Sequence, residues 1–554
     1  MATLLHGPRL GPPACPTTLW RQRVWLMFDS VVSVTLQTRV WGATAWTTVH
    51  VQSTSALLSN TIVLISNTLL PSTKYEYRVL AAGVEVVAPT WFRTMPDGAG
   101  DFVVYQVSDG HDVNDVGYAS ILADYTTNYE PLGIPAFIVQ LGDLYVIASF
   151  SDAATIIAGD ALPEIDAIAP TTRHIPFCYM FDDWDWGGNN SASDNMNLLS
   201  LADARLIQDT LWYDHPRHAT PSYAYALDVA GVPFIVTDQR SQRLYGTNIF
   251  GTANPTTPVW NGTESPRLTG YTLHGAAQVA WLKSVLVEYA SRGFIFYVSP
   301  TSFRPPRAPR TGGSAGRDGI SLYHGNEQIE IVTPLLSAGG GWRNNLVVLS
   351  GDDHYAVVDH ATVATAVHAT ATNINRPGTP IGLPFLEVKT SLGGTLTGAA
   401  SLYGTTHTSI LFGTVLTNAP SGANNFGRWL VTSRENGAEV IVDFAILDRT
   451  LGTPIVDASS RTATFYGRNG IWRRYDVAPP TQNYPPENAP RPGIRFERSY
   501  IDEVSGALTR EGFVTRDYAD RLVARDNVDE PGRDELLRRH HFPHDLDDLI
   551  PPLE

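Results

Sequence analysis

Apolar and polar positions alternate along the chain from about residue 20 to residue 96. In the clearest stretch, Val34 and Leu36 alternate with the polar residues Ser33, Thr35 and Gln37. Further short runs of this kind lie at residues 46–51, 61–65, 75–80 and 84–87. A period of two residues is typical of strands, and short strands separated by turn residues predict a small β-sandwich.

The pattern changes at about residue 100, where short apolar runs begin to alternate with segments of helical periodicity. The predicted helices lie at residues 113–128, 152–168, 195–212 and 275–291. In the last of these, Trp281, Leu282 and Val285 recur at helical spacing, and Gly293 marks its end. Alternating strands and helices predict an α/β domain whose helices cover a central sheet.

Four of the apolar runs end in aspartate. The runs at 102–107 and 136–141 lead to Asp109 and Asp143, and the run at 175–181 leads to the Asp182-Asp183-Trp184-Asp185 stretch. The fourth run, 346–349, is followed by Ser-Gly and then by Asp352 and His354, and His111 follows Asp109 at the same spacing. A single Asp after a strand is usually a helix cap or a turn residue. Four of them predict a metal site, in which two ions clamp a phosphate and activate water.

The chain returns to strand-like patterns after residue 361, including a predicted hairpin of residues 429–432 with 439–444. Six prolines between residues 476 and 493 predict an extended polyproline path. A charged tail follows, with a predicted helix at 517–525. The pair His540 and His541 could suggest a metal tract, but a solvated or partner-docked tail is the preferred interpretation because no carboxylate arrangement accompanies it.

Composition narrows the function. The chain has 554 residues and a net charge of −16, which argues against nucleic acid as a main partner because phosphate backbones are bound by clusters of Lys and Arg. The two cysteines, Cys15 and Cys178, cannot build a disulfide framework or a thiolate zinc site. The sequence predicts no membrane span. The first nine residues do not resemble a secretory signal, so the protein is either mature or not exported by that route.

Residues 70–79 and 92–96 resemble the closing strands of a fibronectin type III-like module. The order of the Asp motifs, together with Thr237-Asp238-Gln239-Arg240 and Gln278-x-x-Trp281-Leu282, resembles the PhoD-like alkaline phosphatases of the calcineurin-like metallophosphoesterase superfamily. The resemblance covers roughly residues 60 to 400. It implies an α+β sandwich core of the α/β class, preceded by an all-β domain. We therefore expect domains at 1–97 (β-sandwich), 98–475 (phosphatase) and 476–554 (linker and tail).

The resemblance also implies roles for individual residues. Asp143 would bridge two metal ions, and the other expected ligands are Asp109, His111, Asp183, Asp352 and His354. Calcium, manganese, iron and zinc all remain open as divalent or trivalent ions, although an oxygen-rich ligand set favours the harder ones. The expected catalytic residues are Arg240, Asp185 and Asn190. Arg240 would hold a phosphate oxygen, with an ion pair to Asp238 as the alternative.

Three positions depart from the family pattern. Ser108 stands where the family usually has a Cys before the first Asp. The family's Tyr after Gly-Asp is matched by Tyr145, which lies one position earlier than usual. Trp184 replaces the His that can protonate a leaving group. An indole N–H cannot act as a general acid. The hydrolysis rate would fall least for substrates with aryl or nucleotide leaving groups, which depart without protonation. The glycine-rich stretch 312–316 lacks the Gly-Lys-Ser ending of a phosphate loop and is interpreted as a mobile lid.

Two functions follow. The first is a metal-dependent phosphomonoesterase or phosphodiesterase, in which metal-bound hydroxide attacks phosphorus. The second is a structural component of a virion or other large assembly that keeps the fold with weak or no activity. The expected partners are a phosphate-ester substrate and, through the C-terminal tail, an oligomer or larger assembly. The sequence does not determine where the protein is located, and a virion or other assembly and the extracellular space are both left as alternatives.

Overall fold

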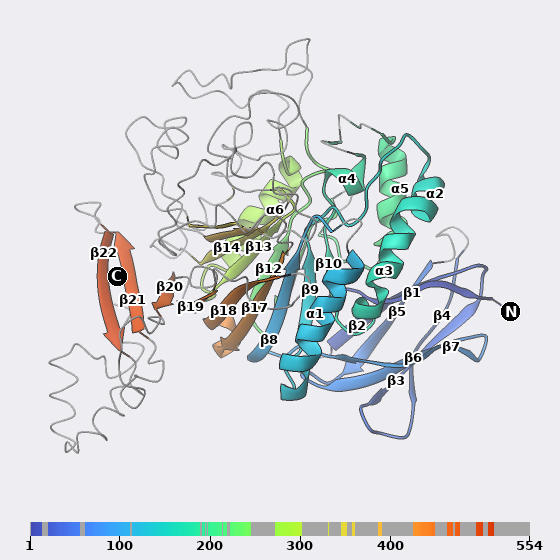
Figure 1. The fold of residues 1–554 in the computed structure, drawn as a ribbon, viewed down its shortest axis with the longest axis horizontal. Coiled ribbons are helices and arrows are strands. Elements are labelled where there is room, and N and C mark those ends of the chain that lie inside the picture. Colours follow the sequence, from blue (N-terminus) through green and yellow to red (C-terminus); the bar gives the residue numbers. More distant parts are fainter. Residues whose placement is uncertain are drawn as a thin grey trace, which may run out of the picture.

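The computed structural model places the elements of the chain in space (Figure 1). It describes residues 2–13, 20–55, 61–110, 114–188, 191–193, 196, 198–212, 214–218, 222–244, 272–301, 331, 345–351, 357–360, 386–389, 425–448, 462–468, 471–476, 495–501 and 508–514. Several sequence-based expectations fall outside these residues: His111, Asn190, Asp352, His354, the stretch 312–316 and the segment 517–525.

The N-terminal part consists of strands in two sheets, one of order β1-β2-β5 and one of order β4-β3-β6-β7. Their bounds are β1 Leu4–Leu10, β2 Trp20–Phe28, β3 Ser33–Val40, β4 Thr47–Ser53, β5 Thr61–Leu69, β6 Lys74–Ala81 and β7 Val84–Arg93. Alternate residues of β6, among them Tyr75, Tyr77 and Val79, are buried, as the period of two predicted. The sequence pattern did not reveal β1, which pairs with β2 in antiparallel fashion.

Two larger sheets form the centre of the molecule. One has the order β10-β9-β8-β17-β18-β19-β20-β21-β22, and the other has the order β11-β12-β13-β14-β16-β15. The first includes β8 Gly100–Val107, β9 Ala136–Gln140, β10 Phe177–Tyr179, β17 Asn425–Arg434, β18 Glu439–Asp448, β19 Thr462–Arg468 and β20 Ile471–Asp476. The second consists of β11 Tyr225–Val229, β12 Val232–Val236, β13 Ile295–Ser299, β14 Leu346–Ser350, β15 Val357–His360 and β16 Leu386–Lys389.

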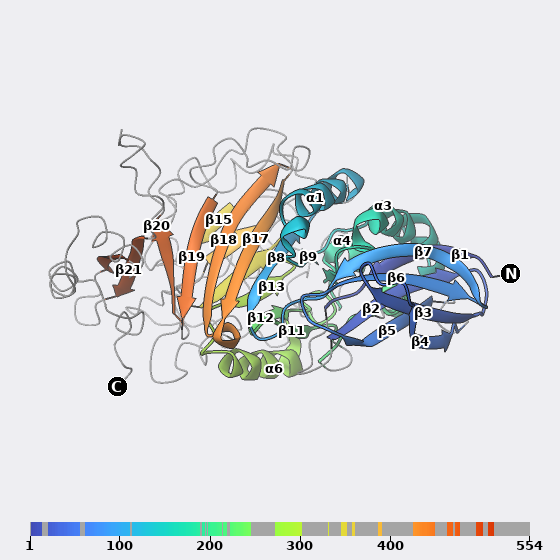
Figure 2. The same cartoon turned by 90° about the horizontal axis from the view of Figure 1, so that it is seen from below.

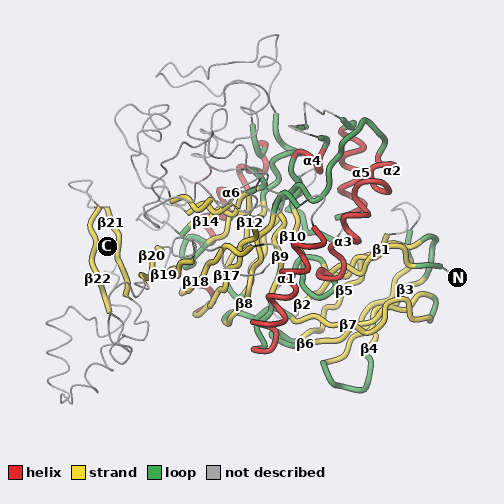
Figure 3. Tube along the Cα trace, viewed as in Figure 1, coloured by secondary structure: helices red, strands yellow, loops and turns green. Residues whose placement is uncertain are grey.

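Helices flank these sheets (Figures 2 and 3). Their bounds are α1 Asn114–Asn128, α2 Ala153–Ile156, α3 Leu162–Thr172, α4 Asp183–Trp186, α5 Leu201–Leu211 and α6 Gly275–Glu288. A π-helical turn, Ile157–Ala161, joins α2 to α3, and 3₁₀ turns lie at Glu130–Leu132 and Glu435–Gly437. Helix α1 lies on the nine-stranded sheet and α6 on the six-stranded sheet, so the two sheets stack between helical layers. This is the mixed α/β architecture that the alternation of strands and helices predicted.

The pleat of the strands explains the layers. In β13, Phe296 packs edge-on against Trp429 of the nine-stranded sheet, whereas Ile295 and Tyr297 belong to the apolar cluster that includes Leu282 of α6. In β8, the hydroxyl of Tyr105 donates to Asp124 of α1 at 2.6 Å. Successive side chains of one strand therefore serve two different layers, as the period of two requires.

The C-terminal region differs from the expectation of an extended tail. Strands β21 Arg495–Ile501 and β22 Leu508–Val514 continue the nine-stranded sheet beyond β20, each paired in antiparallel fashion with its neighbour. The predicted hairpin is present as β17 and β18, which are also antiparallel. Among the described residues, no helix is long and apolar enough to cross a membrane.

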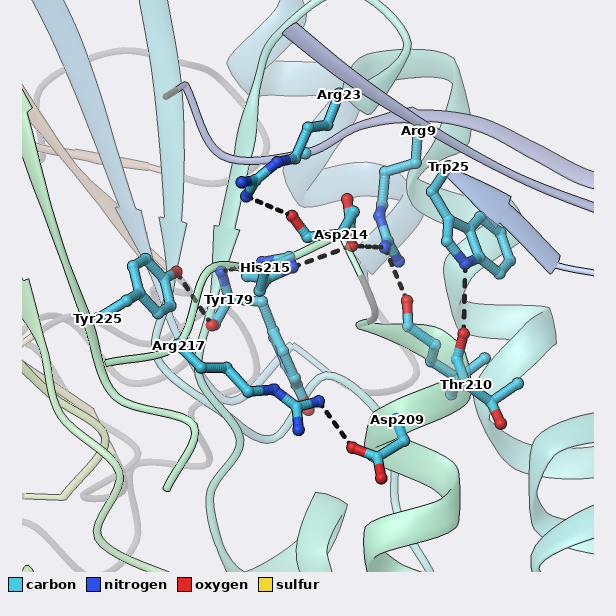
Figure 4. A network of polar contacts seen from close by, with 12 residues as sticks. Arg9, Arg23, Trp25, Tyr179, Asp209, Thr210, Asp214, His215, Arg217 and Tyr225 are labelled. Atoms are coloured by element: carbon cyan, nitrogen blue, oxygen red, sulfur yellow. Dashed lines mark hydrogen bonds and ion pairs between the residues drawn. The ribbon is translucent and has the colours of Figure 1, made fainter. Parts of the chain in front are cut away.

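A buried ion pair joins the N-terminal strands to the α/β part (Figure 4). Arg9 of β1 donates to Asp214 at 2.7 Å, and neither side chain is exposed to solvent. The guanidinium of Arg9 also lies over the rings of Trp25 and Trp212, at 4.8 and 4.1 Å from their centroids. Arg23 of β2 donates to the backbone carbonyl of Asp214 at 2.7 Å. Because the partners come from residues about two hundred positions apart, this contact fixes how the two parts pack.

Candidate metal centre

Three parallel strands bring three aspartates to one edge of the nine-stranded sheet. Strand β8 pairs with β9 and β9 with β10, both in parallel. Parallel strands present their carboxyl ends on the same side. Asp109 follows β8, Asp143 follows β9 and Asp182 follows β10, and all three side chains are buried. The sequence motif and the sheet topology therefore place these residues together.

The backbone at the first two strand ends has an uncommon conformation. Asp109 and Asp143 have φ values of 50° and 53°, in the left-handed region that Asp tolerates better than most residues. The two loops are joined directly, because the N–H of Gly110 donates to the carbonyl of Asp143 at 3.0 Å. The hydroxyl of Ser108 donates to Asp109 Oδ2 at 2.7 Å. Ser108 thus orients the carboxylate of Asp109.

The loops after β9 and β10 approach so closely that Gly142 is required. Gly142 has φ 89°, and a Cβ atom at this position would lie 2.3 Å from Cβ of Asp182. Any larger residue would push the two loops apart. This contact explains the Gly-Asp pattern that follows β9.

The carboxylates form one cluster. Asp143, Asp182 and Asp183 each offer an oxygen, and these oxygens lie within 4.8 Å of one another. Both carboxylate oxygens of Asp143 and Oδ1 of Asp109 are buried without a hydrogen-bond partner among the described residues. Burial, followed by the charges of Asp183 and Asp109, raises the pKa of Asp143 well above its usual value. The carboxylates of this cluster therefore repel one another in a desolvated site.

A cation would resolve this repulsion. Buried carboxylates are normally paired, protonated or bound to metal, because an isolated ionised group is costly to desolvate. Oxygen donors of this kind suit calcium, manganese, magnesium or iron. The unpartnered oxygens of Asp143 and Asp109 are thus the ligand atoms that a metal ion would need, and the residues present fit such an ion.

Arg240 reaches the same cluster from the loop after β12. Its Nε donates to Asp182 Oδ1, and its Nη2 lies 3.9 Å from Asp183 Oδ1. Burial raises the pKa of Asp182 to about 6, although the charge of Arg240 opposes this shift. The ion pair differs from the alternative expected from the sequence, which paired Arg240 with Asp238.

Asp238 instead shapes the loop that carries Arg240. Its carboxylate accepts from the backbone N–H groups of Tyr223 and Ser241, at 2.8 and 3.0 Å. Gln278 of α6 holds the backbone of Asp238 from both sides, because it accepts from its N–H at 2.9 Å and donates to its carbonyl at 2.6 Å. The Gln278 and Asp238 motifs noted in the sequence therefore position Arg240.

The carboxylate of Asp185 accepts hydrogen bonds from the backbone of neighbouring loops. Its carboxylate accepts from the N–H groups of Asp143, Tyr145 and Asp182, at 2.6, 3.0 and 3.1 Å. Burial raises the pKa of Asp185 to about 7, and the hydrogen bonds from Tyr145 and Asp182 oppose the rise. The hydroxyl of Tyr145 lies 3.2 Å from the carbonyl of Asp185, to which it donates. Both residues thus join the loops after β9 and β10, and the catalytic role expected for Asp185 stays a prediction.

The end of β14 lies beside the end of β8, although these strands belong to different sheets. Gln106 of β8 donates to the carbonyl of Ser350 at 3.2 Å. A Cβ atom on Gly351 would lie 2.6 Å from Cβ of Ser108. This contact places Ser350 and Gly351, which begin the fourth motif, beside the residue that precedes Asp109. Asp352 and His354 of this motif lie outside the described residues, as do His111 and Asn190.

Comparison with protein-family models gives no match, and no curated protein matches the sequence. Among solved structures, the chain is similar to "Structure of PhoD", with a TM-score of 0.57 and 14% identity over 84% of this chain and 91% of that chain. The chain has a PhoD-like fold. A second match, "GAP50 the anchor in the inner membrane complex of Plasmodium", has a TM-score of 0.32 and 14% identity over 64% of this chain and 87% of that one, and carries no argument.

Sequence reasoning did not assign a role to Asp182 as a ligand candidate, nor did it find the backbone contacts of Asp185. The signal for Asp182 was its place as the first aspartate after β10, equivalent to Asp109 and Asp143 after β8 and β9. The contacts of Asp185 with Asp143 and Tyr145 left no sequence signal, because they join residues 42 and 40 positions apart.

Proposed function

We propose that this protein is a metal-dependent phosphoric ester hydrolase. The observation that carries the proposal is the buried carboxylate of Asp143, which lies among Asp182 and Asp183 with both oxygens unpartnered in the described part of the chain. The PhoD-like fold supports a phosphoesterase type of site. At 14% identity, the likeness concerns the fold, and the activity rests on the residues.

The proposed ligands are Asp109, Asp143 and Asp183, with His111, Asp352 and His354 from outside the described residues. Asp182 joins this set because its carboxylate belongs to the same cluster. We propose two or more ions, with Asp143 between them. When bound, such ions supply Lewis acidity, which polarises a phosphoryl oxygen and makes water a stronger nucleophile at neutral pH.

Arg240 is the proposed phosphate contact. A guanidinium offers planar, paired donors that match phosphate geometry. Its Nε donates to Asp182, and its Nη2 lies 3.9 Å from Asp183 Oδ1. A phosphate oxygen entering the cluster would therefore meet a cation whose direction is already set, at little cost in side-chain entropy.

The alternative function is a structural component of a large assembly with a silent site. Trp184 favours it, because this residue directly follows Asp183 and cannot donate a proton to a leaving group. A silent enzyme would keep the carboxylate cluster without turnover. Activity measurements on purified protein therefore separate the two functions.

The test is Asp143→Asn. This change should remove metal and activity together, because the cluster would have one negative charge fewer to offset the repulsion between two cations. Bound metal is measured per chain by mass spectrometry, and activity on an aryl phosphate and an aryl phosphodiester. The matched control is Asp152→Asn, which alters an exposed carboxylate that caps the start of α2 by accepting from the N–H of Thr155. Full metal occupancy in the Asp143 variant would contradict the proposed site, and metal-bound wild type without activity would favour the structural alternative.

A further inference from the structure

We propose that Asp185 is a positioning residue that sets the geometry, and hence the affinity, of the metal centre by joining two ligand loops. This inference rests on the proposed function. Its carboxylate accepts from the backbone N–H groups of both loops that supply carboxylates to the cluster. Its contacts therefore act through Asp143 and Asp182.

The contacts of Asp185 divide between its two oxygens. Oδ2 accepts from the N–H of Asp143 and from the N–H of Asp182, and Oδ1 accepts from the N–H of Tyr145. Asp143 and Asp182 follow adjacent parallel strands, so one side chain holds both strand ends. The distance between their carboxylates depends on this shared acceptor.

Asp185 is itself held in place. Gln208 of α5 donates to the carbonyl of Asp185 at 2.9 Å and to the hydroxyl of Tyr145 at 3.1 Å. The same Tyr145 hydroxyl donates to that carbonyl. Helix α5 therefore holds the backbone of Asp185 in place, and the Asp185 carboxylate is buried.

The left-handed backbone of Asp143 gives this contact a specific purpose. Asp143 has φ 53°, a conformation that costs free energy unless its surroundings enforce it. Its N–H makes the shortest of the three contacts to Asp185, at 2.6 Å. Residues that orient ligands typically change metal affinity about 10- to 100-fold when altered. The same range is expected here.

A carboxylate is needed because all three partners are donors. An Asn at this position has one acceptor oxygen, and its amide group would present N–H to at least one backbone N–H. Asp185→Asn keeps the size of the side chain and removes at least one of the three hydrogen bonds that connect the loops. Asp124→Asn is the matched control. Asp124 is also buried and also accepts from three donors, which are Tyr105 of β8, Asn128 of α1 and Arg428 of β17.

The experiment measures binding of Mn²⁺ alone to the full chain by titration calorimetry, below the melting temperature of every variant. Asp185→Asn is expected to weaken Mn²⁺ binding about 10- to 100-fold, whereas Asp124→Asn should lose thermal stability and keep wild-type affinity. If Asp185→Asn does not fold, Asp185→Glu and Asp124→Glu are compared in the same way, and only the first should weaken binding.

The outcomes are distinct. Wild-type protein that binds no Mn²⁺ would overturn the proposed function, and the role of Asp185 with it. Wild-type binding with equal affinity in the folded Asp185 variant would overturn the positioning role alone. Equal weakening in the Asp185 and Asp124 variants would also overturn it, because the loss would then follow general destabilisation.

Discussion

Asp143 combines two features that each cost free energy. Its backbone is left-handed, and its buried carboxylate lacks a hydrogen-bond partner in the described part of the chain. A left-handed residue other than glycine costs roughly 1–3 kcal/mol and persists where its surroundings enforce it. Such sites concentrate where geometry serves a ligand. The cost at Asp143 is thus consistent with a residue selected for binding rather than for stability.

Gly142 is the residue whose substitution should disturb this geometry most directly. Gly142→Ala adds a methyl group 2.3 Å from Cβ of Asp182 at a φ of 89°. The expected loss in unfolding free energy is roughly 2–5 kcal/mol, from overpacking together with left-handed strain. Chemical denaturation measures it. Gly159→Ala is the control, because its Cβ meets no atom within 4 Å in a helical turn; unchanged stability in both variants would contradict the close approach.

Trp184 is the residue that separates a working site from a silent one. Its side chain is half-buried, and its backbone N–H donates to Asp183 Oδ1 at 2.8 Å. We expect Trp184→His to raise activity on an alkyl phosphate more than on an aryl phosphate, because only the poorer leaving group needs a proton donor. A general acid contributes about 100- to 10,000-fold. Initial rates on both substrates, with melting temperatures, provide the measurement; a destabilised variant inactive on both would favour the structural role.

At the scale of elements, local periodicity predicted what local sequence determines. The runs before Asp109 and Asp143 became β8 and β9, and the helical stripe with Trp281 and Leu282 became α6. The hairpin of β17 and β18 was predicted because its strands are close in sequence. The fold class followed from the change of period near residue 100.

Contacts between distant elements could not be predicted in this way. Nothing local shows that β14 belongs to a different sheet from β8, or that Gly351 then packs on Ser108. The partner of Arg240 was missed for the same reason: Asp182 lies 58 positions away, whereas Asp238 is a near neighbour. Strand β1 escaped notice because Gly7 and Pro8 interrupt its pattern. In the tail, the density of prolines before β21 concealed the strands that follow.

At the scale of the whole molecule, the N-terminal strands pack against the α/β part through buried polar contacts. Besides the Arg9 ion pair, His215 donates from Nδ1 to Asp214 and accepts from the N–H of Tyr179 at Nε2, each at 3.0 Å. Tyr179 ends β10, three residues before Asp182. The packing of the N-terminal strands therefore continues to the strand that carries part of the candidate centre. We propose that residues 1–97 and 98–475 form two separate domains joined by such contacts.

A second histidine makes this packing sensitive to acid. His174 follows α3, stacks on Trp91 of β7 at a centroid distance of 4.6 Å, and donates from Nδ1 to the carbonyl of Trp91 at 3.0 Å. Burial, with a smaller contribution from the charges of Arg173 and Lys74, lowers the pKa of His174 to about 4, although the hydrogen bond to Trp91 opposes this shift. A folded-state pKa below the unfolded value means that the unfolded chain binds protons first. The stability contributed by neutral His174 is therefore complete above about pH 6.5 and is lost as the pH falls toward 4.

His174→Gln tests this dependence, because Gln retains a donor for the Trp91 carbonyl and does not titrate. The unfolding free energies of wild type and variant, measured by chemical denaturation at pH 7 and pH 4.5, should converge on acidification by roughly 2 kcal/mol, the value expected for a shift of this size in a half-buried group. Comparing differences cancels the other groups that titrate in the same range, including the carboxylates of the candidate centre. His50→Gln, on strand β4, controls for the loss of a histidine elsewhere in the N-terminal strands. A wild-type-to-variant difference that stays constant between the two pH values would show that His174 is protonated equally in folded and unfolded chains, and that the acid sensitivity of the packing lies elsewhere.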